Sequence, residues 1–386
     1  MLSRRIPHLA ALLMVLATVM TLSLSSYLLL VVPRGQAFDF YWLWQGGRAV
    51  LSGQDPYGAD TTRAIQLGVL GDLLPADQYQ PVFPYPAYSA LVLIPFLAMP
   101  FRLSVSLWLG VQLPLLLVTL LLGLDLLNWQ PSTRLLSILA VLGAFGFRYP
   151  IIVLTLGQVT ILVLTLVVSA AWMLRHRRPR LAGVLLALAF IRPDVALLGL
   201  VLIGLCTWRL PEIRRFLITF VVAIVILVLA PMLLIGFWPK AWSGAITTYA
   251  SNPYSAWPMA VLPAPLSRVL AVLLLVSGLY LLIRLARASS SKESALCASG
   301  VVLIALLVMK QTGSYNLTYA LTSAVILTRL APRPIERTAV ILSLLSPWAY
   351  MALGWRESGL ELLAVPMQFL LLQLVIAKSG RRDLGR

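Results

Sequence analysis

Long runs of apolar residues alternate along this chain with short polar segments. The longer runs predict membrane-spanning helices, because a helix needs about 20 apolar residues to cross the hydrocarbon core of a bilayer. Several runs are shorter than this. The expected spans are residues 9–32, 104–127, 135–149, 157–174, 216–236, 266–285, 295–309, 317–330, 338–351 and 360–377.

Lysine and arginine gather in short clusters between the apolar runs. Such clusters indicate the cytoplasmic side, because loops that stay in the cytoplasm carry an excess of Lys and Arg. Both termini are then expected in the cytoplasm, and the N-terminal run is read as a first span and not as a signal peptide, because it is long and has no small-residue cleavage site. The clusters are Arg4 and Arg5, residues 175–180, Arg209 with Arg214 and Arg215, residues 284–292, residues 329–337 and the tail from Lys378.

Two segments leave the topology open. Residues 181–208 lie between two cytoplasmic clusters and are interrupted around Arg192, which predicts a helical hairpin with Arg192 at its tip. Residues 88–101 are short and contain two prolines, so they either cross the membrane or form an interfacial or re-entrant helix. The interfacial alternative keeps residues 175–180 in the cytoplasm. It gives an all-α protein of about twelve spans with one large outer loop, residues 33–103.

Composition supports this membrane interpretation. The 386 residues are 60% hydrophobic and 11% charged, with a mean hydropathy of +0.92, which lies outside the range of soluble domains. A formal charge of +17 does not predict nucleic-acid binding, because the basic residues follow the loops between spans. Cys206 and Cys297 lie in apolar stretches and are expected to be packing residues. We expect the chain to divide into residues 1–210, which include the outer loop, and C-terminal helices, residues 211–386.

The outer face lacks a histidine in this topology, because His8 and His176 both fall on the cytoplasmic side. A general base on the outer face would therefore be a carboxylate. The candidates are Asp39, Asp55, Asp60, Asp72, Asp77, Glu357 and Glu361.

Asp39 is the candidate nearest to the end of a span, and aromatic residues surround it. It begins a short helix within residues 38–57. The helix has apolar residues at helical spacing, which predicts that it lies along the membrane surface and ends near Gly53. An aspartate at this position also has a purely structural interpretation, since it can cap the first turn of the helix.

Three basic residues are candidates for binding an anion. Arg192 is followed by Pro193 and Asp194 in apolar sequence, where an unpaired charge is costly. It either pairs with Asp194, extends to the interface, or binds a lipid phosphate. Lys310 and Arg148 are further candidates on the same side, with topological or packing roles as the alternative.

The order of motifs in the first 200 residues resembles glycosyltransferase family 87 of the C superfold, the polyprenol-phosphate-mannose-dependent mannosyltransferases. The motifs are the acid and aromatics at Asp39-Phe40-Tyr41, "LSGQDPY" (51–57), "FPYPAYSALVLIP" (83–95), "LGQVTILVLTL" (156–166) and "LAGVLLALAFIRPDVALL" (181–198). The chain departs from the family at Ala87, where a second proline is usual, and at Arg192, where lysine is common. Arginine keeps the charge and suits phosphate.

The resemblance implies an inverting sugar transfer from a polyprenyl-phosphate donor, with Asp39 as general base and without a metal or other cofactor. The acceptor would be a hydroxyl of a glycolipid or cell-envelope glycan, with a protein also open, and the sugar mannose, with a pentose also open. The catalytic part would be residues 1–210, with its site on the outer face of the cell membrane. Membrane lipid would be a partner, and nucleic acid would not. The donor phosphate would contact Arg192, Lys310 and Arg148, and the substrates Tyr41, Trp42, Asp55, Tyr57, Tyr85 and Gln158.

Two other classes of protein fit the same pattern. A lipid or sugar transporter, or a flippase, would also carry intramembrane charges such as Arg192 and Asp194. A noncatalytic membrane subunit would use Asp39 as a helix cap only. The substitution Asp39→Asn separates these classes, because asparagine caps a helix about as well as aspartate but cannot act as a carboxylate base.

Overall fold

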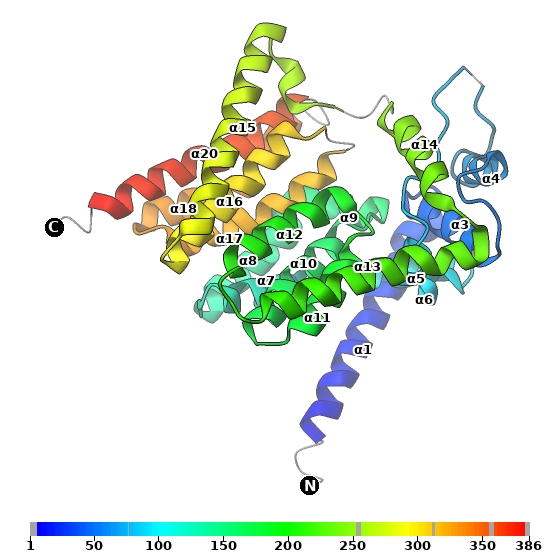
Figure 1. The fold of residues 1–386 in the computed structure, drawn as a ribbon, viewed down its shortest axis with the longest axis horizontal. Coiled ribbons are helices and arrows are strands. Elements are labelled where there is room, and N and C mark those ends of the chain that lie inside the picture. The colour runs from blue at the N-terminus through cyan, green and yellow to red at the C-terminus, as the bar shows by residue number, and fades with distance from the viewer. Residues whose placement is uncertain (1–5, 76, 252–255, 311–312, 355–358, 383–386) are drawn as a thin grey trace. The chain divides into compact units, whose positions relative to one another are not determined.

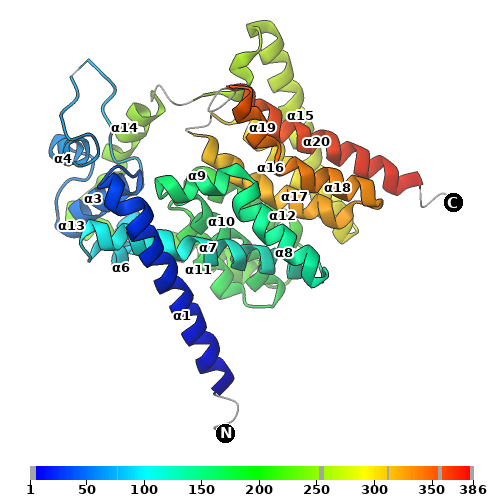
Figure 2. The same ribbon diagram turned by 180° about the vertical axis from the view of Figure 1, so that it is seen from behind.

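A computed structural model (Figures 1 and 2) describes residues 6–75, 77–251, 256–310, 313–354 and 359–382. The elements within these ranges are α, 3-10 and π helices, in agreement with the predicted all-α class.

Six helical segments in the described ranges are long and apolar enough to cross a membrane, so the chain is a multi-pass membrane protein. A seventh span would result if one bent pair, residues 133–146 and 148–156, crosses as a unit. The predicted total of about twelve spans stays a prediction. The six segments are Leu13–Arg34 in α1 and its continuation, α7 (Phe101–Leu126), α13 (Ile213–Ile235), α15 (Ala264–Arg287), α16 (Ser291–Val308) and most of α20 (Gly359–Arg382).

Two predicted spans are broken in the structure. The helix expected at residues 135–149 begins as α8 (Thr133–Val141) and passes into a π turn that ends at Phe147, whose backbone is extended. The chain then turns by 55° into α9 (Arg148–Leu156).

The span expected at residues 338–351 is two short helices, α18 (Pro334–Ser343) and α19 (Ser346–Ala352). Pro347 explains this second break, because proline fits the first turn of a helix and lacks the N–H that would continue the preceding one.

The chain folds into two compact units that interleave along the sequence. The first unit comprises Met1–Val118, Leu154–Leu162 and Val225–Ser251. The second comprises Thr119–Val153, Val163–Ile224 and Asn252–Arg386. The expected division at residue 210 stays a prediction about function.

The first unit is built around α3 (Phe40–Leu51), which packs against α4 (Ala59–Leu70), α5 (Ser89–Val92) and α6 (Ile94–Leu97) (Figure 1). Gly46 and Gly47 allow this close packing: a Cβ at Gly46 would lie 2.2 Å from the Phe83 ring and one at Gly47 2.6 Å from Leu97. The helix ends as predicted, with Gly53 in the left-handed conformation at φ +73°. Each of α5 and α6 has four residues and is too short to span a bilayer by itself, and the interfacial position of residues 88–101 stays a prediction.

The second unit is a helical bundle in which α16 packs against α15, α17 (Ala320–Leu330) and α20 (Figure 2). The predicted interruption near Arg192 is present: α11 (Pro179–Ala189) ends just before it, and α12 (Pro193–Thr207) begins just after it. Arg192 therefore occupies a helix start, where its backbone departs from helical geometry at φ −124° and ψ 88°. The remaining helices that matter for the sites are α10 (Thr160–Arg175), the 3-10 helix η5 (Ser314–Tyr319) and α14 (Trp238–Ala250).

Candidate active site

The Asp39 side chain does not cap the helix that follows it. Its backbone is helical, with φ −62° and ψ −25°, and its carboxylate makes no capping hydrogen bond to α3. Instead, Oδ2 accepts a hydrogen bond of 2.6 Å from Nε2 of Gln158, 119 positions later in the chain. The capping interpretation is therefore wrong for this aspartate. Its partly buried carboxylate faces a distant polar side chain within the first unit.

Gln158 lies in a tight turn between α9 and α10. The preceding residue, Gly157, has φ +71°, a left-handed conformation that glycine adopts without strain. A Cβ at position 157 would lie 2.9 Å from Cβ of Phe40. Glycine is thus required both for the turn and for its close approach to the start of α3.

Two side chains of α7 hold this turn by its backbone. Trp108 Nε1 donates to the carbonyl of Gly157 at 2.8 Å, and Gln112 Nε2 donates to the carbonyl of Gln158 at 2.9 Å. The two residues are one helical turn apart and so share a face of α7. The Trp108 ring also stacks on Phe40, with centroids 5.2 Å apart and planes 12° apart. The turn and the first residue of α3 are consequently fixed on the same buried tryptophan.

Arg34 is the charged residue that acts on Asp39 from the end of the first span. Its guanidinium donates to the carbonyl of Ala37 at 3.0 Å and to that of Thr155, and it lies 4.4 Å from the centroid of the Phe38 ring. Arg34 is not among the residues predicted from the sequence. Its signal in the sequence was a basic residue at the predicted outer end of a span, where the charge bias used to predict the topology disfavours Lys and Arg.

Burial raises the pKa of Asp39 above its usual range, while the hydrogen bond from Gln158 and the positive charge of Arg34 oppose this rise. A carboxylate with a raised pKa is a stronger proton acceptor than a solvated one. Asp39 therefore has the properties of a general base that is hydrogen-bonded on one side.

The aromatic residues after Asp39 divide into two kinds. Tyr41 is buried and packs edge-on against Phe101, with centroids 4.9 Å apart, so its role is in the core of the unit. Trp42 is partly buried, and its indole Nε1 is shielded from solvent without a hydrogen-bond partner among the described residues. Of the two, Trp42 retains a donor for a ligand.

Three further predicted residues of the outer loop lie together. The hydroxyl of Tyr57 donates to the carbonyl of Tyr85 at 3.0 Å, and both rings contact Phe83. Asp55 is exposed and its Oδ1 accepts from the backbone N–H of Tyr57 at 2.9 Å, which is a local turn contact. From α14, Trp242 donates to the carbonyl of Pro84 at 3.0 Å. These contacts order the loop, and they assign Asp55 a structural role beside any role in binding.

In the second unit, Arg192 pairs with Asp194. Its Nη2 lies 2.6 Å from Oδ2 of Asp194, and its Nη1 donates to Oδ1 of Asn316 at 2.8 Å. The neighbour pair that the sequence left open is thus present. Asn316, which was not predicted from the sequence, is the second hydrogen-bond partner of the Arg192 guanidinium.

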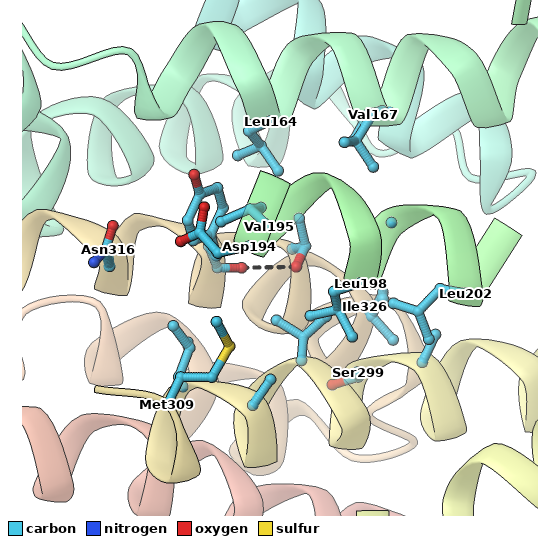
Figure 3. A pocket seen from close by; sticks show the side chains of 18 of the residues that line it. Leu164, Val167, Asp194, Val195, Leu198, Leu202, Ser299, Met309, Asn316 and Ile326 are labelled. Carbon is cyan, nitrogen blue, oxygen red and sulfur yellow. Dashed lines mark hydrogen bonds between the residues drawn. The ribbon is translucent and has the colours of Figure 1, made fainter. Parts of the chain in front are cut away.

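A cavity of about 200 Å³ lies beside this pair, between α10, α12, α16, η5 and α17 (Figure 3). Its walls are mostly apolar, with Leu164, Val167, Leu198 and Leu202 among the lining residues. Asp194, Lys310 and Asn316 also line it. Figure 3 shows Asp194 and Asn316 toward one end and Leu202 toward the other, so the cavity is amphipathic along its length.

The third predicted basic residue, Arg148, is in a buried ion pair. Its Nη1 lies 2.6 Å from Oε1 of Glu361, and the hydroxyl of Tyr149 donates to the same oxygen at 3.0 Å. Both charged side chains are almost fully buried. The predicted roles of Arg148 at a phosphate and of Glu361 as a base gain no support from these contacts. Glu357 lies outside the described residues.

The chain matches the model of a known protein family. The model of glycosyltransferase family 87 matches residues 83–309, a stretch that includes Gln158 and Arg192 and begins after Asp39. No curated protein and no solved structure matches the chain.

Proposed function

Because the chain belongs to glycosyltransferase family 87, we propose that it transfers a sugar from a polyprenyl-phosphate donor to a hydroxyl of a glycolipid or cell-envelope glycan at the outer face of the cell membrane. The family makes the protein a membrane glycosyltransferase. Mannose as the sugar, the C-type fold with about twelve spans, and cytoplasmic termini belong to the proposal.

The observation that carries the proposal is the Asp39 carboxylate held by Gln158 while its helix is left uncapped. In the proposed reaction, Asp39 accepts the proton of the acceptor hydroxyl while the hydroxyl oxygen of the acceptor attacks the anomeric carbon of the sugar. The bond between that carbon and the phosphate oxygen breaks, and the phosphate leaves with the electron pair. A single displacement of this kind inverts the anomeric configuration.

The cavity in the second unit supports a lipid-linked donor. Apolar walls suit the first isoprene units of a prenyl chain, while Lys310 and the Arg192–Asp194 pair provide charge at the polar end. An arginine side chain has five N–H donors, and the contacts to Asp194 and Asn316 engage three of them. The others are proposed to bind the phosphate, whose developing charge a cation stabilises.

The test is transfer of radiolabelled sugar from polyprenyl-phosphate mannose to a membrane acceptor by the purified protein. We expect the wild type to form product and Asp39→Asn to lose at least about a thousandfold in kcat, because asparagine cannot take the proton. Asp72→Asn, which changes an exposed aspartate of the same loop, is the matched control and should retain activity. A folded Asp39→Asn protein with wild-type turnover would contradict the assignment.

The alternative is a lipid or sugar transporter without transferase activity, and the charged pair beside an apolar cavity is the observation that favours it. A transporter would form no product in either version of the assay. It would instead move a labelled lipid-linked sugar across the bilayer of a proteoliposome, and Asp39→Asn would leave that movement intact.

A further inference from the structure

The hydrogen bond from Gln158 to Asp39 indicates a role for Gln158 other than substrate binding. Resting on the proposed function, we propose that Gln158 is the positioning residue of the base: its amide, fixed from α7 by Trp108 and Gln112, holds the Asp39 carboxylate in one orientation and in its ionised form.

The hydrogen bond divides the two carboxylate oxygens between two tasks. Nε2 of Gln158 is a donor only, and at 2.6 Å it engages Oδ2 of Asp39. Among the hydrogen bonds of the described residues, none uses Oδ1. The second oxygen is thus left for the hydroxyl proton of an acceptor. A donor to a carboxylate also favours the charged form over the protonated form, because hydrogen bonds to an ionised acceptor are stronger.

The amide of Gln158 can orient the carboxylate because contacts with α7 and α3 hold its backbone in place. The Gly157–Gln158 turn is tied to α7 through both carbonyls, and glycine lets it lie against Phe40. Phe40 directly follows Asp39 and stacks on the same Trp108 that binds the turn. The Trp108 side chain therefore contacts both the turn that carries Gln158 and the residue next to Asp39. Such shared support keeps a reactive group in a productive geometry.

Apart from Gln158, the charged and polar side chains around Asp39 in the described part of the chain form no hydrogen bond with its carboxylate oxygens. Among the residues that the structure describes, the other side chain that acts on Asp39 is Arg34. Its guanidinium donates to the carbonyls of Ala37 and Thr155, so it contributes charge to the carboxylate and no direct hydrogen bond. The residues that α7 contributes to the turn, Trp108 and Gln112, are neutral. In this unit the orientation of the carboxylate accordingly depends on the glutamine.

The test measures the protonation of Asp39 directly, without substrate. The infrared carbonyl band of a protonated carboxyl is followed against pH in protein labelled with 13C-aspartate, and the Asp39→Asn spectrum is subtracted to isolate Asp39. In Gln158→Leu we expect the midpoint to move upward by about one pH unit, because the donor that favours the ionised form is lost. Trp108→Phe keeps the ring against Phe40 but removes the bond to Gly157, and should move the midpoint in the same direction by less.

The control is Gln373→Leu, a buried glutamine of the second unit whose amide donates to the carbonyl of Leu296 at 3.0 Å. It should leave the Asp39 band unchanged. In turnover, the acid limb of the kcat profile of Gln158→Leu should move with the infrared midpoint, while KM for the donor stays within about twofold. A glutamine that bound substrate would instead raise KM and leave the midpoint in place.

An unchanged midpoint in folded Gln158→Leu, or in folded Trp108→Phe should the leucine variant not fold, would overturn the inference. The proposed function fails separately: an infrared shift without product from any version of the protein, wild type included, would remove the transferase assignment and leave the coupling of Gln158 to Asp39 established.

Discussion

Asp39 couples the stability of the first unit to pH, because its pKa is raised by burial in the folded chain. The folded state then binds the proton more tightly than the unfolded state, in which the pKa is about 3.9. Stability is therefore greatest below that value and is lost as pH rises toward the folded pKa. Asparagine carries no proton to lose and can still accept the hydrogen bond from Gln158.

We predict that Asp39→Asn melts at or above the temperature of the wild type, and that the difference grows as pH rises through this window before it becomes constant. Thermal unfolding in detergent across pH 4 to 8, read by tryptophan fluorescence, measures it. Exposed Asp72→Asn serves as the control and should show no such trend. A variant that is less stable than the wild type at neutral pH would instead indicate that the ionised carboxylate stabilises the fold.

Single residues could be selected from the sequence, but partners that lie far away along the chain could not. Asp39 was selected as a carboxylate near the end of a predicted span, and its catalytic role stays a prediction. The local pattern also allowed a helix cap, which does not form. Its partner Gln158 is separated from it by two predicted spans, residues 104–127 and 135–149, and the packing of α7 against the turn brings the two together. For Arg192 the partner could be proposed from the sequence, because Asp194 lies only two residues away.

The Gly157 turn is the element that we expect to tolerate least change. A Cβ there would lie 2.9 Å from Phe40 and would also have to adopt φ +71°. Left-handed backbone costs a non-glycine residue about 1–3 kcal/mol. We predict that Gly157→Ala loses about that much stability and, because the turn carries the amide that positions Asp39, loses about a hundredfold in kcat.

The matched control is Gly204→Ala in the interior of α12, where a new Cβ meets nothing within 4 Å. Alanine is favoured over glycine there by about 0.5–1 kcal/mol, so this variant should be slightly more stable and fully active. The melting temperature tests the predicted change in stability, and radiolabel transfer tests the predicted change in activity, each measured on both variants. Equal activity of the two would show that the turn does not position the base.

Periodicity located most helices, and it failed where a helix is broken. Residues 40–51 were recognisable from apolar residues at helical spacing and a terminal Gly53, both of which are local signals. The bend at Phe147 follows a π turn inside an apolar run, and hydropathy does not distinguish such a run from a straight span. Pro347 marks the other break and could have been read from the sequence, because proline rarely continues a helix.

At the scale of the whole molecule, the chain returns to the first unit twice after leaving it, at Leu154–Leu162 and Val225–Ser251. Hydropathy could predict a multi-pass protein, because the length of an apolar run is a local property of the chain. The orientation that the basic clusters indicate stays a prediction. Hydropathy and charge could not predict which helices share a unit, because apolar faces in a membrane protein carry little information about their neighbours. The cavity of the second unit was for this reason invisible in the sequence.

That cavity makes the donor lipid testable through the length of its chain. A phenyl ring fits a cavity of about 150 Å³, so Ala305→Phe, at a lining residue of α16, should occupy most of the 200 Å³. Each methylene removed from an apolar site loses about 0.8 kcal/mol, and exclusion of two such groups corresponds to about tenfold in affinity. We predict that KM for a long-chain polyprenyl-phosphate sugar rises by about tenfold or more in Ala305→Phe.

A donor whose prenyl group is too short to enter the cavity should be used equally well by Ala305→Phe and the wild type, since it gains nothing from these walls. Leu273→Phe, at an exposed position of α15, controls for added bulk and should leave KM unchanged for both the long and the short donor. A uniform rise of KM for both donors would mean that the substitution disturbs the bundle. Unchanged KM for the long donor would place its chain elsewhere and leave the apolar end of this cavity to ordinary membrane lipid.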